Sequence, residues 1–192
     1  MNRIDALSSL LRFRNDAIVV SVFSSAADWS TMSNHPLDFY AVGAMGQASS
    51  MGLGFAIGMP DRKVIVLDGD GSLLMNLGSI VTMASVAPKN LIYFVLQNND
   101  YECIGSYPVP GKGRVNFSKM ARAAGFDKVY EFNTIEDLQS SLEQLMDEPG
   151  PIFATIHTDI AKNGSIDENI DDTLEKYNVR FIEKMNELTA KN

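Results

Sequence analysis

Short apolar runs rich in β-branched residues alternate with amphipathic segments along most of the chain. Runs of this kind predict strands buried on both faces, which is typical of a parallel sheet. The segments between them place apolar residues at helical spacing. The alternation predicts an α/β fold in three layers, α/β/α, around a mostly parallel sheet.

The pattern places each predicted element within a few residues. Strands are expected at 17–23, 63–68, 90–97, 128–132 and 151–158, with a weaker sixth strand at 39–42. Helices are expected at 4–11, 45–57, 73–86, 117–124 and 135–146.

A polar segment follows the last strand and is expected to form an amphipathic helix over 165–190. Its apolar residues recur at intervals of three and four: Ile170, Leu174, Tyr177, Phe181 and Met185. We expect this stripe to pack on the sheet of the same chain, with a subunit contact as the alternative. Because no repeat or linker interrupts the sequence, residues 1–192 are expected to form a single domain.

Composition narrows the classes of function. Acidic residues number 24 against 16 basic ones, a net charge of −8, which disfavours broad electrostatic binding to nucleic acid or an anionic membrane. A single cysteine, Cys103, excludes an intramolecular disulfide and any zinc site of the CxxC type. The N-terminal residues are interrupted by charges, and no apolar stretch approaches the length of a membrane span, so we expect a cytoplasmic protein.

The sequence Gly69-Asp70-Gly71-Ser72 directly follows the predicted strand at 63–68. Glycines allow a tight turn and close approach of a ligand, and the free N–H groups of a helix start can bind phosphate. The Asp70 carboxylate would repel a phosphate unless a cation such as Mg²⁺ lay between them. The alternative is a plain turn in which Asp70 caps the helix.

The next predicted strand ends in Gln-Asn-Asn-Asp, and Asn98 stands 98 − 70 = 28 residues after Asp70. That spacing suits a βαβ unit, which brings both strand ends to the same carboxyl edge of the sheet. Asn98 can offer an amide oxygen to the same ion, and the main-chain carbonyl of Asp100 can supply a third oxygen. The second segment favours a metal and phosphate site over a plain turn.

Together, the Gly-Asp-Gly turn, the gap and the asparagine-rich strand end resemble the diphosphate- and metal-binding signature of thiamine-diphosphate (ThDP) enzymes. The resemblance implies Asp70, Asn98 and Asp100 as the Mg²⁺ ligands. The segment 39–58, FYAVGAMGQASSMGLGFAIG, resembles the cofactor-cradling turn of the same enzymes. The cofactor-binding set that the resemblance implies is Gly43, Ala44, Met45, Gly69, Asp70, Gly71, Ser72, Asn98, Asp100 and Tyr101.

Within that set, the resemblance implies that the Gly43 carbonyl accepts a hydrogen bond from the aminopyrimidine, and that Met45 is the wedge that bends the cofactor. An ordinary core methionine is the alternative for Met45. Other phosphate-binding motifs fit poorly. The two glycine-containing segments miss the G-x-G-x-x-G spacing of dinucleotide-binding folds, and no GK[ST] of a Walker loop occurs.

Among ThDP enzymes the chain resembles the small β subunit of the sulfopyruvate and phosphonopyruvate decarboxylase group. This implies a carboxy-lyase acting on a 2-oxo acid with ThDP and Mg²⁺. It further implies a pyrimidine-domain (α) partner that supplies the activating glutamate, in an α₂β₂ or larger hetero-oligomer, so that the single chain is inactive. The alternatives are a subunit of another ThDP enzyme, either a carboligase or a 2-oxo acid oxidoreductase, or a non-catalytic ThDP-binding module. An oxidoreductase would lack its cluster cysteines here, because only Cys103 is present.

Two segments depart from that group and point to a different 2-oxo acid. ECIGSYPVPGKGRVNF, residues 102–117, stands where a GGQPT-like stretch is usual, and VFSSAADWSTMSNHP, residues 22–36, lacks the group's glycine-containing pocket sequence. Lys112 and Arg114 are candidates to neutralise an anionic substrate tail, with a solvated loop as the alternative. His35 and Glu102 are candidate proton-transfer groups.

Overall fold

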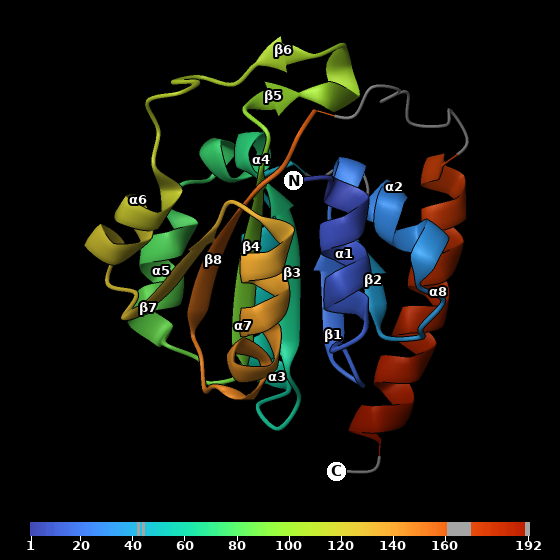
Figure 1. Ribbon diagram of the computed structural model, residues 1–192. Helices are drawn as coiled ribbons and strands as arrows, with labels where there is room; N and C mark the ends of the chain where they lie inside the picture. Colours follow the sequence, from blue (N-terminus) through green and yellow to red (C-terminus); the bar gives the residue numbers. More distant parts are fainter. Residues whose placement is uncertain (42, 44, 161–169, 191–192) are drawn as a thin grey trace.

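Six parallel strands form one central sheet in the computed structural model of the protein (Figure 1). The structure describes residues 1–41, 43, 45–160 and 170–190. The strands are β1 (Ile18–Ser21), β2 (Asp38–Tyr40), β3 (Val64–Gly69), β4 (Leu91–Gln97), β7 (Lys128–Phe132) and β8 (Ile152–His157). They are arranged in the order β2-β1-β3-β4-β8-β7, and every pairing is parallel. The carboxyl ends of all these strands therefore meet at one edge.

Helices cover both faces of the sheet, because each strand buries apolar side chains on its two sides. One layer contains α1 (Arg3–Leu11), α2 (Phe23–Met32) and α7 (Ile135–Asp147). The opposite layer contains α3 (Ala48–Gly58), α5 (Ser79–Val86) and α6 (Phe117–Ala124). A short helix, α4 (Asp70–Met75), begins where β3 ends. The predicted three-layer α/β/α fold is confirmed.

The C-terminal helix α8 (Ile170–Thr189) lies along the edge strand β2 (Figure 1). Leu174 and Phe181 are buried, and the Asn178 side chain accepts from Tyr40 N at 2.9 Å and donates to Tyr40 O at 2.7 Å. The expected packing on the sheet of the same chain is confirmed, and Asn178 closes the hydrogen bonds of an otherwise open strand edge. Residues 165–169 and the side chain of Ile170 lie outside the described part. Of the helices in that part, none is long and apolar enough to cross a membrane.

Three predicted elements differ from the structure. The strand expected at 17–23 ends at Ser21, and α2, which was not predicted, begins at Phe23. The helix expected at 73–86 is broken into α4 and α5, because Asn76 leaves the helical conformation and donates from Nδ2 to the Gly46 carbonyl at 2.8 Å. The helix expected at 45–57 begins at Ala48, after a turn.

A small hairpin above the carboxyl edge was also missed (Figure 1). Its antiparallel strands are β5 (Asp100–Tyr101) and β6 (Tyr107–Pro108), joined through the 3₁₀ helix η1 (Glu102–Ile104). The chain reverses at Gly105 and Ser106, which both have positive φ, +100° and +60°. The hairpin places the residues after Asn98 over the ends of β3 and β4.

Candidate functional site

An open cavity of about 430 Å³, counting its solvent-filled mouth, lies at the carboxyl edge of the sheet. The predicted residues that line it are Met45, Gly69, Asp70, Gly71, Ser72, Asn98, Asp100, Tyr101 and Glu102. The structure thus brings most of the predicted set to one place. Gly43 has positive φ, +62°, and lies outside the cavity lining, while Ala44 lies outside the described residues.

Asp70 joins the ends of the two central strands. Its Oδ1 accepts from Gly71 N at 2.8 Å, and its Oδ2 accepts from Asn99 N, beyond β4, at 2.6 Å. Gly69, not Asp70, is the N-cap residue of α4, so the plain helix-cap interpretation does not describe Asp70. Burial raises the pKa of Asp70 to about 6, although both hydrogen bonds act in the opposite direction. A buried carboxyl with a raised pKa gains stability from a nearby cation.

The oxygen atoms around Asp70 fit a Mg²⁺ ion. Among the described residues, Asn98 Oδ1 accepts one backbone N–H, from Asp100 at 2.9 Å, and its second lone pair could bind a ligand. The Asp100 Oδ1 atom is buried without a hydrogen-bond partner among the described residues, and Oδ2 lies 3.9 Å from Lys112 Nζ. Carboxylate, amide and carbonyl oxygens are the ligands that Mg²⁺ prefers. Within the described ranges no three His, Cys, Asp or Glu side chains form a metal cluster.

Asp68 is a second buried carboxylate, which sequence reasoning missed. It is fully buried, accepts a hydrogen bond from the Tyr93 hydroxyl, and has its pKa raised to about 6 by burial. The Ser72 hydroxyl bonds to Asp68 and accepts from Gly46 N at 2.9 Å. The Ser72 side chain is therefore occupied in tying the turn before α3 to α4. The signal in the sequence was an aspartate within a buried apolar strand.

The turn around Gly46 lies against α4. Gly46 has φ +78°, and a Cβ placed there would lie 3.2 Å from Met75 Cβ and 3.3 Å from Asn76 Cβ. This position requires glycine for both its conformation and its space. Met45 is held at the cavity by this turn and is absent from the buried core, contrary to the core-methionine alternative.

Gly71 lies against the side chain of Tyr101, a contact that the sequence did not show. A Cβ at this position would lie 2.2 Å from Tyr101 Cε1, so the tyrosine ring occupies the space that a side chain would need. The Tyr101 hydroxyl is 3.4 Å from Gly71 O. Gly69 has an ordinary φ of −94° and no atom near its Cβ position, so the tight turn expected at this glycine is not observed.

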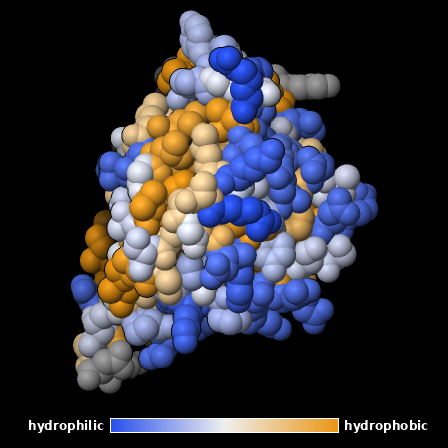
Figure 2. Space-filling view, turned by 90° about the vertical axis from the view of Figure 1, so that its left-hand side faces the viewer, coloured by the Kyte–Doolittle hydropathy of each residue, from blue (hydrophilic) through white to orange (hydrophobic). Residues whose placement is uncertain are grey.

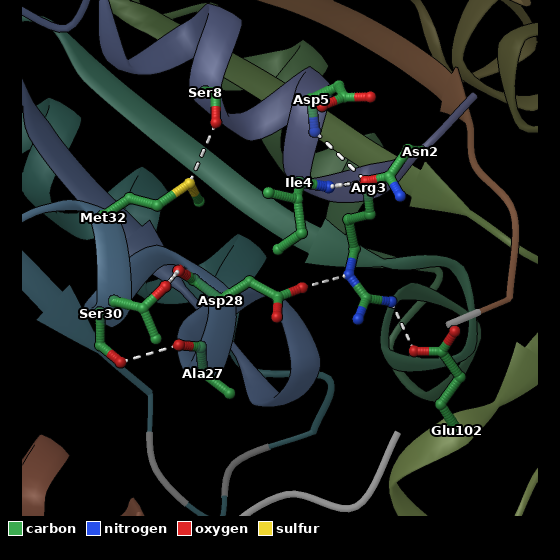
Figure 3. A network of polar contacts seen from close by, with 11 residues as sticks. Asn2, Arg3, Ile4, Asp5, Ser8, Ala27, Asp28, Ser30, Met32 and Glu102 are labelled. Atoms are coloured by element: carbon green, nitrogen blue, oxygen red, sulfur yellow. Dashed lines mark hydrogen bonds and ion pairs between the residues drawn. The ribbon is translucent and has the colours of Figure 1, made fainter. Parts of the chain in front are cut away.

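Glu102, in the cavity wall, forms an ion pair with Arg3, which lies near the N-terminus (Figure 3). Arg3 Nη1 lies 2.5 Å from Glu102 Oε2, and Arg3 Nε lies 2.6 Å from Asp28 Oδ2. The side chains of Arg3 and Glu102 are only 9% and 3% exposed. This network joins α1, α2 and η1, and no sequence pattern distinguished Arg3 from other surface arginines.

The remaining candidates lie away from the cavity. His35 lies in the loop between α2 and β2, at the amino edge of the sheet, where its Nδ1 accepts from Leu37 N at 3.2 Å and burial lowers its pKa. The structure therefore does not bring His35 to this cavity. Lys112 and Arg114 follow β6 and are not part of the cavity lining.

Metal binding at this site is expected to weaken below pH 6. As a metal ligand Asp70 would act as the carboxylate, and a pKa of about 6 leaves roughly nine in ten of these groups protonated at pH 5. The apparent affinity for Mg²⁺ with ThDP should be about tenfold lower at pH 5 than at pH 7. Calorimetric titrations at both pH values measure this, after subtraction of the cofactor's own protonation in buffer.

An Asp68→Asn variant is the control for this pH dependence, because it removes the other carboxyl with a raised pKa. In this variant the apparent affinity for Mg²⁺ with ThDP should still fall about tenfold between pH 7 and pH 5. An affinity that does not vary with pH, or a dependence that disappears in Asp68→Asn, would contradict the assignment to Asp70.

Known proteins resemble the chain in sequence over most of its length. Residues 20–156 match the family described as the thiamine pyrophosphate enzyme, C-terminal TPP binding domain. Sulfopyruvate decarboxylase subunit beta of Methanothermobacter thermautotrophicus is 33% identical over 186 residues, which cover 96% of each chain. Phosphonopyruvate decarboxylase of Streptomyces viridochromogenes is 36% identical over 167 residues, covering 86% of this chain and 41% of that longer protein.

Solved structures agree on the fold. A structure described as a thiamin diphosphate-dependent enzyme from Mycobacterium smegmatis superposes with a TM-score of 0.68 over 83% of this chain and 32% of the other, at 22% identity. The 2-oxoglutarate:ferredoxin oxidoreductase of Magnetococcus marinus gives a TM-score of 0.65 over 87% of this chain and 66% of the other, at 17% identity. The fold, the cavity at its carboxyl edge and the sequence matches lead to the same conclusion: the chain belongs to the thiamine pyrophosphate enzymes and contains their C-terminal TPP-binding domain.

Proposed function

We propose that this chain is the β subunit of a split 2-oxo acid decarboxylase that depends on ThDP and Mg²⁺. The proposal rests on one observation above all. Asp70, Asn98 and Asp100 all line a cavity at the carboxyl edge, in a chain that matches a sulfopyruvate decarboxylase subunit beta over 96% of its length. Bound ThDP would supply the nucleophile and the electron sink for loss of CO₂.

The residues of this chain would bind and orient the cofactor. Asp70, Asn98 and the Asp100 carbonyl would hold Mg²⁺ against the diphosphate, and the main chain at Gly71 and Ser72 would contact its oxygens. Met45, fixed by the glycine turn, would support the bent cofactor, with the Gly43 carbonyl and Ala44 beside the pyrimidine. Glu102 lies in the same wall, where it could take part in proton transfer while Arg3 holds its carboxylate in place.

A partner subunit would supply the pyrimidine half of the site. Relatives of this chain's length are named subunit beta, whereas the phosphonopyruvate decarboxylase extends well beyond the matched 41%. The surface offers a place for such a partner. Figure 2 shows the side of the molecule that carries α5, where apolar side chains gather in a band. We call the large apolar side chains exposed on α3, α4 and α5 the apolar band: Ile57, Met75, Val81 and Val86.

The apolar band is expected to bind the partner, because large exposed apolar patches mark interfaces and Met75 belongs to the helix that borders the cavity. Val81→Glu should weaken assembly with the pyrimidine-domain subunit at least tenfold, since it would bury a charge. Val179→Glu on α8 is the matched control, because the two valines are 52% and 57% exposed. Sedimentation of the co-expressed subunits measures assembly, and equal loss in both variants would contradict the assignment.

Two other ThDP reactions stay open. Acetolactate synthase isozyme 1 large subunit of Escherichia coli is 33% identical over 131 residues, 62% of this chain and 22% of that protein, which favours carboligation as the second candidate. The ferredoxin oxidoreductase shares the fold, but a chain with one cysteine cannot hold a Cys₄ cluster alone. A ThDP-binding module without catalytic activity is a further candidate function.

The direct test assays the purified chain alone and with its partner, each with ThDP and Mg²⁺, for CO₂ and aldehyde release from a panel of 2-oxo acids. We expect turnover only in the complex. Turnover by the single chain would refute the split site, C–C bond formation without free aldehyde would indicate a carboligase, and tight ThDP binding without any turnover would indicate the non-catalytic module.

A further inference from the structure

Building on the proposed function, we propose that Phe23 determines substrate specificity, and that the substrate is a small 2-oxo acid whose distal group is uncharged. Sulfopyruvate and phosphonopyruvate, the substrates in the names of the relatives, both carry an anionic distal group. The inference rests on the backbone at Phe23, on the neighbours of its side chain and on the charges of the cavity wall.

Phe23 has a backbone conformation that its residue type rarely adopts. Its φ is +48°, in the left-handed region that favours glycine, although it is a bulky residue. It stands where β1 gives way to α2 and lines the cavity. Strained residues of this kind persist where the surrounding structure holds them, and they concentrate at ligand sites.

The surroundings of Phe23 are apolar. Val22 and Leu96, both nearly buried, line the same cavity, as does Met45. Phe23 itself is partly buried. Its side chain packs against the core cluster of the layer that contains α3. An aromatic wall beside the cofactor site favours a short apolar substituent and limits its length.

The charges of the cavity wall disfavour an anionic substituent. Apart from Asp70 and Asp100, which are assigned to the metal, its charged side chains are Glu102 and a single cation, Arg3. That cation is paired with two carboxylates, those of Asp28 and Glu102 (Figure 3). Lys112 lies outside the lining and faces Asp100 at 3.9 Å. In the described part of the wall, no cation is therefore left to compensate a sulfonate or phosphonate, whose burial without a partner is costly.

The test uses the assembled complex with its partner, saturated with ThDP and Mg²⁺. The measurement is kcat/KM for pyruvate, 2-oxobutyrate, 2-oxohexanoate, 3-sulfopyruvate and 3-phosphonopyruvate. We expect kcat/KM for pyruvate and for 2-oxobutyrate to be at least tenfold higher than kcat/KM for either anionic substrate. Phe23→Gly, which suits the positive φ and opens the wall, should raise the ratio of 2-oxohexanoate to pyruvate at least tenfold, and Phe23→Leu should give an intermediate ratio.

Phe13→Leu is the matched control, since Phe13 is also partly buried but packs on the opposite core cluster. It should leave the substrate ratios unchanged. A preference for either anionic substrate, or an unchanged ratio in both Phe23 variants, would overturn this inference and leave the proposed decarboxylase intact. A complex that binds ThDP but converts none of the five 2-oxo acids would overturn both.

Discussion

Asp70→Asn is expected to weaken binding of ThDP with Mg²⁺ by about 100-fold or more. The variant keeps the size of the side chain and one acceptor for the two N–H groups, of Gly71 and Asn99, that now bind Asp70. It removes the negative charge from the centre of the metal site, and loss of a charged, buried interaction typically costs about 3 kcal/mol. Calorimetric titration of the cofactor into the complex, and into the chain alone, measures the effect.

The control for this experiment is Asp61→Asn. Asp61 is exposed in the turn between α3 and β3, away from the carboxyl edge. The Asp61→Asn variant should bind ThDP with the same affinity as the unaltered chain. If Asp70→Asn retained affinity within threefold while folded by circular dichroism, the metal assignment would fail, and with it the ThDP function proposed for the cavity.

Arg3→Met is expected to lower the free energy of unfolding by about 3 kcal/mol, because it removes a buried ion-pair partner from two carboxylates. Glu102 would suffer most, since its side chain is 3% exposed, whereas Asp28 is 23% exposed and retains partial hydration. η1 should become less firmly held above the cavity as a result. Urea unfolding of the purified chain measures the loss.

Two further variants separate this buried pair from a surface pair. Arg62→Met breaks the contact with Asp16, whose side chain is 79% exposed, and should cost less than about 1 kcal/mol. Glu102→Gln in the Arg3→Met background should recover part of the loss, because the neutral amide is cheaper to bury. Equal losses in Arg3→Met and Arg62→Met would show that the network of Figure 3 does not stabilise the fold.

Whether a predicted site residue lies at the cavity depends on the kind of sequence pattern that suggested it. Asp70, Asn98 and Asp100 line one cavity because each stands at the end of an apolar run, and strand ends in a parallel sheet share one edge. Gly71 lines the same cavity, and the ring of Tyr101, 30 residues away, lies where a side chain at this position would be. The sequence did not show that the loop of His35 lies at the opposite edge, because a histidine's chemistry says nothing about which edge of the sheet its loop occupies.

The sequence by itself determined the strands of the central sheet and their parallel arrangement, because hydrophobic periodicity acts between neighbours along the chain. Only the tertiary structure decided the break at Asn76, the strained Phe23 and the union of Arg3 with Glu102, residues 99 positions apart. Those features depend on contacts that exist only after the sheet has assembled and brought distant segments together. Local sequence patterns contain no information about such contacts. The position of the cavity at the carboxyl edge could therefore be predicted from the sequence, whereas the contacts of Phe23, Arg3 and Glu102 in its wall could not.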